Sequence, residues 1–162
     1  MQPEEFINEA RRVSPELPAP HILQLVIYQA AKVADTDVED DQNAQFRELV
    51  LKELQTGVTL ADRPLLRFLL EQEIAYHVDA WGIFESIRLC GSLLSTLAQL
   101  EDVPLLWEAK TTSFDTMCGF DIQFLVGAGV APTLAYLQNI QEKWAQDARE
   151  YIEECQQAGD FR

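Results

Sequence analysis

Glu73 and His77, in the segment EQEIAYHVDAW, are the side chains best spaced for chemistry. Four positions apart, they project from one face of a helix, with Asp79 close behind them. A carboxylate and an imidazole in this arrangement can ligate a metal ion. Helical metal sites of this kind need several such ligands, and the chain has only one other histidine, His21. We therefore expect a surface ion pair, or Asp79 as a helix cap, and keep a site at this trio as the alternative.

The thiol of Cys118 is a second candidate, because it lies beside Gly119 in TSFDTMCGFD near an expected helix boundary. Backbone N–H groups at such a boundary can activate a thiol. A nucleophilic cysteine also needs a base, and both histidines are distant in sequence. Free cysteine usually behaves as a small buried hydrophobic residue, so we predict structural roles for Cys118, Cys90 and Cys155.

The most irregular stretch of the expected helical part is LLWEAKTTSFDTMCGFDIQFLVGAG. Irregular polar connections on a rigid scaffold often carry function. A ligand or partner site is therefore expected first at Trp107, Lys110, Asp115, Cys118 and Asp121. The alternative is that Asp115 and Asp121 only cap short helices.

No motif in the chain predicts a catalytic residue, a cofactor or a metal. The patterns GxGxxG, GxxxxGK[ST], HExxH, GxSxG and the EF-hand loop are missing. Three cysteines without CxxC spacing predict neither a disulfide framework nor a zinc site, and reduced thiols favour a cytoplasmic protein. No run of about 18 apolar residues occurs, so we expect no membrane span.

The composition predicts a folded, strongly acidic domain. Of 162 residues, 48% are hydrophobic, and 27 acidic against 12 basic side chains give a formal charge of −15. Phosphate backbones and anionic lipids repel such a surface, whereas a basic protein partner is attracted to it. The tryptophans Trp81, Trp107 and Trp144 each lie near the apolar stripe of an expected helix, so we predict that all three pack in the core.

Helical spacing of apolar residues recurs along the chain, and no strand with sustained alternation is found, although TGVTL could pair briefly. We predict one all-α domain over residues 1–162, with an N-terminal helix and Pro-rich strap in residues 1–20 and a helical stack in residues 21–158. An acidic loop is expected at residues 35–45, and Gly91 suggests a close helix crossing. The stack has about eight helices, predicted at residues 3–12, 21–35, 40–54, 62–78, 79–100, 103–111, 113–126 and 132–158.

A short sequence is repeated within the chain: DRPLL at residues 62–66 is similar to DVPLL at residues 102–106, 40 residues later. In both, an acid near the N-cap and a proline in the first turn signal a helix start. Two or more helices per 40 residues resemble HEAT and armadillo repeats, which stack into a short solenoid. An irregular bundle of antiparallel helices is the alternative architecture.

The resemblance implies binding of proteins or peptides along one face of the stack. Together with the charge and the missing catalytic motifs, it favours a noncatalytic interaction module, such as an adaptor, regulator or immunity-type inhibitor, with an acidic surface for a basic partner. The alternative is an enzyme or small-molecule-binding protein that uses Cys118 or the pair Glu73 and His77.

Overall fold

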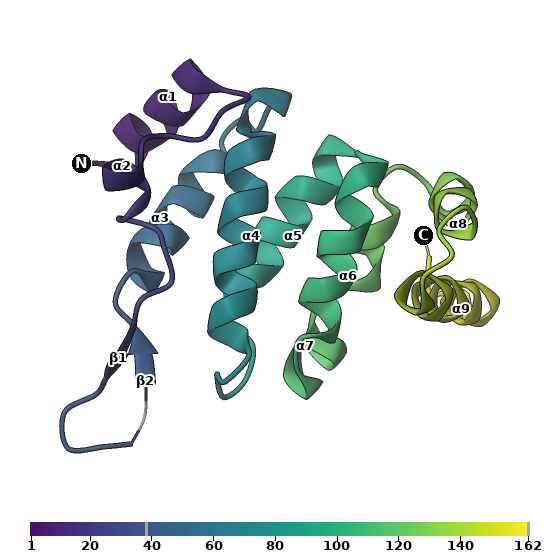
Figure 1. The fold of residues 1–162 in the computed structure, drawn as a ribbon. Coiled ribbons are helices and arrows are strands. Elements are labelled where there is room, and N and C mark those ends of the chain that lie inside the picture. Colours follow the sequence, from purple (N-terminus) through teal and green to yellow (C-terminus); the bar gives the residue numbers. More distant parts are fainter. Residues whose placement is uncertain (38, 162) are drawn as a thin grey trace.

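The computed structural model describes residues 1–37 and 39–161, and its regular secondary structure is nearly all helical, as predicted (Figure 1). No helix of these described ranges is both long and apolar enough to cross a membrane. The described residues form nine α-helices: α1 Pro3–Val13, α2 Pro20–Leu23, α3 Ala44–Leu54, α4 Arg63–His77, α5 Glu85–Leu97, α6 Val103–Thr111, α7 Phe114–Gly119, α8 Val130–Gln138 and α9 Lys143–Ala158.

The helices stack in pairs along a row. Helix α1 packs on α3, α4 on α5, α6 on α7 and on the 3₁₀ turn Ile122–Val126, and α8 on α9. Successive pairs touch through α4 with α6 and through α3 with α5. Figure 1 shows the row running from α1 at the N-terminal end to α8 and α9 at the other end. The all-α fold is thus built from neighbouring helical hairpins.

A leucine-rich core runs between the helices of the row. In α4, Leu66, Leu69 and Leu70 are fully buried, because their three- and four-residue spacing keeps them on one face. Each such side chain stabilises the fold by about 1.5–3 kcal/mol through burial. At Gly91 of α5 an added Cβ would lie 2.5 Å from the ring of Phe120, so the close neighbour of this glycine is an aromatic side chain and not the backbone of a crossing helix.

Two buried aspartates, each just before the start of a helix, bind arginines of an earlier helix. Arg11 of α1 donates from Nε and Nη2 to the carboxylate of Asp62, at 2.6 and 2.9 Å, just before α4 begins. Arg63 of α4 donates in the same way to Asp102 just before α6, at 2.8 and 3.0 Å, and Arg67 binds the same carboxylate. The two helix starts recognised in the sequence are therefore also the points where successive helices are joined.

Replacing Asp102 by asparagine is expected to lower the free energy of unfolding by about 1.5–3 kcal/mol, the range for hydrogen bonds to charged groups. The substitution keeps the volume but removes the charge that pairs with Arg63 and Arg67. Urea denaturation measures the effect. Glu101→Gln, at the exposed acid next in the chain, is the control and should change stability by less than about 0.5 kcal/mol. An equal effect of both substitutions would contradict this role of Asp102.

The prediction of one helix over residues 21–35 is wrong. Only the short α2 is helical there, and the chain then turns into strand β1, Ala30–Lys32. This strand pairs antiparallel with β2, Glu39–Asp41, with Ala30 opposite Asp41. The predicted acidic loop is therefore largely a β-hairpin, and its residue Val38 lies outside the described residues.

Side chains distant in sequence hold this segment out of a helix. The amide Nδ2 of Asn43 donates to the carbonyls of Gln24 and Ile27, at 3.0 and 2.8 Å. The amide oxygen of Gln72 accepts from the backbone N–H of Tyr28 at 2.8 Å. Backbone groups that a helix would pair internally are thus satisfied by side chains of other elements.

Three smaller expectations also fail. Helix α5 begins at Glu85, with Phe84 as its N-cap residue rather than Asp79, and residues 78–84 form a turn in which Gly82 has φ 89°. The predicted last helix is divided into α8 and α9, which pack against each other as one continuous helix could not. The stretch TGVTL forms no strand and leads instead into the 3₁₀ turn Leu60–Asp62.

Candidate functional site

The carboxylate of Glu73 lies in a buried polar network and not on the surface. Arg47 of α3 donates from Nε to Glu73 Oε1 at 2.8 Å and forms an ion pair with Asp41 of β2. The hydroxyl of Ser86 in α5 donates to Glu73 Oε2 at 2.7 Å, and Arg47 Nη1 donates to the carbonyl of Val26 at 3.2 Å. The expected surface ion pair is therefore wrong: the ion pair of Glu73 is buried, and the network around it joins α3, α4, α5 and β2.

Both ring nitrogens of His77 are used by the fold. The backbone N–H of Phe84 donates to Nε2 at 3.0 Å, so the proton is on Nδ1, which lies 2.7 Å from the carbonyl of Glu73. Burial lowers the pKa of His77, although the carbonyl and carboxylate of Glu73 oppose this shift. The alternative site at Glu73 and His77 thus has its lone pairs already engaged. The hydrogen bond between His77 and Phe84 instead holds the turn at residues 78–84, which contains Trp81.

Acidification is expected to destabilise the protein through His77. In the unfolded chain this imidazole takes up a proton near its usual pKa of 6.5, whereas the folded protein binds the proton only at lower pH. Its contribution is complete above the unfolded pKa and is lost as the pH falls, with a slope of up to about 1.4 kcal/mol per pH unit. Denaturation at several pH values between about 7.5 and 5.5, where histidines titrate, measures this loss.

His77→Gln should flatten that dependence, because the substitution removes the titrating group. His21→Gln, at the exposed histidine of α2, should leave the slope of the parent protein. Identical slopes for the parent and His77→Gln would contradict the assignment.

Trp107 and Lys110, expected at a ligand site, are both buried in α6. Trp107 packs on Tyr151 of α9 with ring centroids 5.8 Å apart. The ammonium of Lys110 donates to the carbonyls of Met117 and Phe120, at 2.8 and 2.6 Å, at the end of α7. Burial lowers the pKa of Lys110. Lys110 therefore binds the carbonyls at the end of α7 and is too buried to contact a ligand at the surface.

The aspartates of the same stretch also bind backbone N–H groups. Asp121 accepts from the N–H of Gln123 at 2.9 Å and caps the 3₁₀ turn. For Asp121, the alternative prediction of a helix cap is therefore confirmed. Asp115 accepts from the N–H of Gly82 at 3.0 Å. Ser113, not Asp115, is the N-cap residue of α7. The contact of Asp115 fixes the turn at residues 78–84 against the start of α7.

The three cysteines differ in exposure. Cys90 is buried and its thiol donates to a backbone carbonyl, Cys155 is half-buried, and Cys118 is exposed on α7. Neither histidine offers Cys118 a base, since His77 is fully engaged and His21 is exposed in α2 near the other end of the chain.

A cavity of about 560 Å³ opens between the β-hairpin and the turn after α4. Sequence reasoning did not predict this hairpin pocket, because its walls come from segments about 50 residues apart. In Figure 1 the hairpin, this turn and α7 all lie along the lower side of the row of helices. The pocket is lined by Tyr28, Val33, Asp37, Asp40, Tyr76, Asp79, Ala80, Trp81 and Phe84.

Aromatic rings form one wall of the hairpin pocket. Phe84 stacks on Tyr76, with centroids 5.0 Å apart and planes 3° apart, and Tyr28 lies 5.8 Å from the same ring. The hydroxyl of Tyr76 donates to Asp40 at 2.9 Å, and burial with this carboxylate raises the pKa of the phenol. Trp81 is 93% exposed, so the prediction that it packs in the core is wrong.

Carboxylates form the other part of the lining. Asp37, Asp40 and Asp79 are all exposed, and no basic side chain of the described residues pairs with any of them. Arg47 lies 5.9 Å from the ring centroid of Tyr76, but it is buried and paired with Asp41 and Glu73. The pocket therefore combines open ring faces with uncompensated negative charge.

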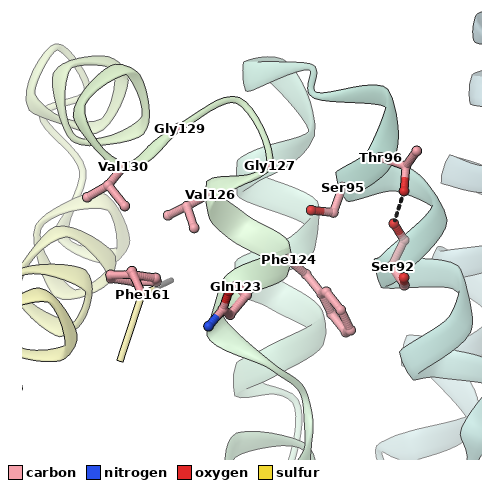
Figure 2. A pocket seen from close by; sticks show the side chains of 10 residues that line it. All are labelled: Ser92, Ser95, Thr96, Gln123, Phe124, Val126, Gly127, Gly129, Val130 and Phe161. Carbon is pink, nitrogen blue, oxygen red and sulfur yellow. Dashed lines mark hydrogen bonds between the residues drawn. The ribbon is translucent and has the colours of Figure 1, made fainter. Parts of the chain in front are cut away.

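Figure 2 shows a different hollow, of about 480 Å³, between α5 and the chain after the 3₁₀ turn. Gly127 lies so close to α5 that an added Cβ would be 2.2 Å from the carbonyl oxygen of Ser95. The lining of this hollow contains hydroxyls and apolar groups but no charged side chain, so nothing in the hollow selects an ionic ligand. It is lined by Ser92, Ser95, Thr96, Gln123, Phe124, Val126, Gly127, Gly129, Val130 and Phe161.

The charge and the open aromatic surface thus coincide at the hairpin pocket, which makes it the strongest candidate site in the described part of the chain. Comparison with protein-family models, with curated proteins and with solved structures finds no match for this chain.

Proposed function

We propose that the protein is a noncatalytic interaction module that binds a basic segment of a partner protein at the hairpin pocket. The observation that carries the proposal is the exposed indole of Trp81, which lines one cavity together with three carboxylates that form no ion pair with a basic side chain of the described residues. Exposed aromatic side chains are the usual anchors of protein interfaces. Acidic groups at the rim favour a basic partner and speed its association.

Further apolar exposure supports an interface rather than a closed ligand site. Val33 and Phe84 of the lining are 43% and 41% exposed, and Val78 at the start of the turn is 58% exposed. Phe114, 81% exposed, begins α7, where Asp115 contacts the turn. Exposed apolar side chains beside a pocket whose lining is partly charged are typical of a site for another protein.

The wider proposal includes a HEAT- or armadillo-like arrangement and a cytoplasmic location. The ion pairs of Asp62 and Asp102 support the first, because each aspartate lies just before a helix start and binds an arginine of an earlier helix. The free thiol of exposed Cys118 supports a reducing compartment. An adaptor, regulator or inhibitor role would use the same surface.

The test is binding of fluorescently labelled synthetic peptides to the purified protein, followed by anisotropy. A basic peptide containing arginine, lysine and leucine is compared with one of the same length in which glutamate replaces the basic residues. We expect the basic peptide to bind and its affinity to fall severalfold between about 50 and 200 mM salt, as screening increases. The acidic peptide should not bind.

Equal affinity for both peptides, or none for either, would refute the proposed function. Binding of the basic peptide that Trp81→Ala leaves unchanged would place the interaction elsewhere on the acidic surface and refute the assigned site.

A further inference from the structure

We infer that the hairpin pocket takes the guanidinium group of an arginine in the partner segment. This inference rests on the proposed function and adds to it the chemical group that is recognised. The ring faces, the carboxylates and the arginine contacts elsewhere in the molecule each support it.

The open ring faces suit a flat cation. Tyr76 is buried, and Phe84 covers one of its faces in a nearly parallel stack. The accessible faces therefore belong to Phe84, 41% exposed, and Trp81, 93% exposed. A quaternary ammonium is held best inside a box of several rings. A guanidinium needs only one open face, because it stacks flat on an aromatic ring.

The carboxylates suit the same group. Asp37 and Asp79 are exposed and accept no hydrogen bond from a basic side chain of the described residues, while Asp40 already accepts from Tyr76. A guanidinium can bind a carboxylate through two parallel N–H donors while its plane rests on a ring. A lysine ammonium is a compact, strongly hydrated charge and gains little from exposed carboxylates alone.

The protein already places one guanidinium group over an aromatic ring and between two carboxylates. Arg47 lies 5.9 Å from the ring centroid of Tyr76, between the carboxylates of Asp41 and Glu73. The hairpin pocket offers the exposed rings of Phe84 and Trp81 together with carboxylates that have no basic partner among the described residues. It therefore presents to an arginine of the partner the two kinds of group that surround Arg47, an aromatic ring and carboxylates.

The test compares two peptides of equal length and charge, one with arginine and one with lysine as its only basic residue, in the anisotropy assay. The arginine peptide should bind at least about threefold more tightly, an advantage that stacking and paired hydrogen bonds supply. N-acetylarginine amide and tetramethylammonium are then titrated into isotope-labelled protein. The indole N–H resonance of Trp81 should shift with the first and not with the second.

Asp79→Asn should reduce the advantage of arginine over lysine, whereas Glu154→Gln, at an exposed acid of α9, should not. Equal affinity of the two peptides, or a larger shift with tetramethylammonium, would overturn the arginine inference and leave the proposed function standing. Failure of both peptides to bind would overturn the two together.

Discussion

Arg47→Met is expected to lower the free energy of unfolding by about 3–5 kcal/mol, the usual cost of removing one partner from a buried ion pair. The side chains of Arg47, Asp41 and Glu73 are all fully buried. Methionine fills much of the space but leaves two carboxylates without their cation. The free energy is measured by urea denaturation followed by circular dichroism.

Two variants make this result specific. Arg149→Met removes an arginine whose pair with Glu153 is solvent-exposed at 3.9 Å, and it should cost less than about 1 kcal/mol. Adding Glu73→Gln to Arg47→Met should recover part of the loss, because the amide still accepts the hydroxyl of Ser86 without its charge. A cost for Arg47→Met no larger than that of Arg149→Met would show that the network does not hold the hairpin to the stack.

Trp81→Ala is expected to weaken binding of the basic peptide by about tenfold or more, as truncation of an aromatic anchor does at interfaces. The same substitution should change the free energy of unfolding by less than about 0.5 kcal/mol, because the indole is 93% exposed. Anisotropy gives the affinity, and denaturation gives the stability of the same preparation.

Leu60→Ala is the matched control for that substitution. Leu60 is also exposed, at 60%, but it precedes α4, whereas Trp81 follows the other end of this helix. It should leave peptide affinity unchanged. An equal loss of affinity in both variants would mean that general surface hydrophobicity, and not the hairpin pocket, binds the peptide.

The hairpin pocket depends on the buried network, so the two predictions are connected. Glu73 anchors Arg47, which holds Asp41 at the end of β2, and His77 of the same helix holds Phe84. Arg47→Met should therefore also weaken binding of the basic peptide, because the hairpin that forms one side of the pocket is held less firmly. This loss is expected even where the variant stays folded. Trp81→Ala has no such effect on the network.

Local signals determined the helix starts. At residues 62–66 and 102–106 an acid is followed by a proline in the first turn, and both patterns begin helices as predicted, α4 and α6. Ser113 likewise caps α7 through the N–H of Thr116. Such signals act within one turn of the chain, so no knowledge of distant contacts is needed to recognise them.

The sequence by itself determined the all-α class, the excess of negative charge and most helix starts, because these follow from composition and from neighbours within a few residues. Only the tertiary structure decided that residues 24–32 leave the helix, since Asn43 and Gln72 bind their backbone. It also decided that Trp81 faces solvent and that Glu73 and His77 are internal. These outcomes depend on contacts between residues far apart in the chain, which local spacing does not encode.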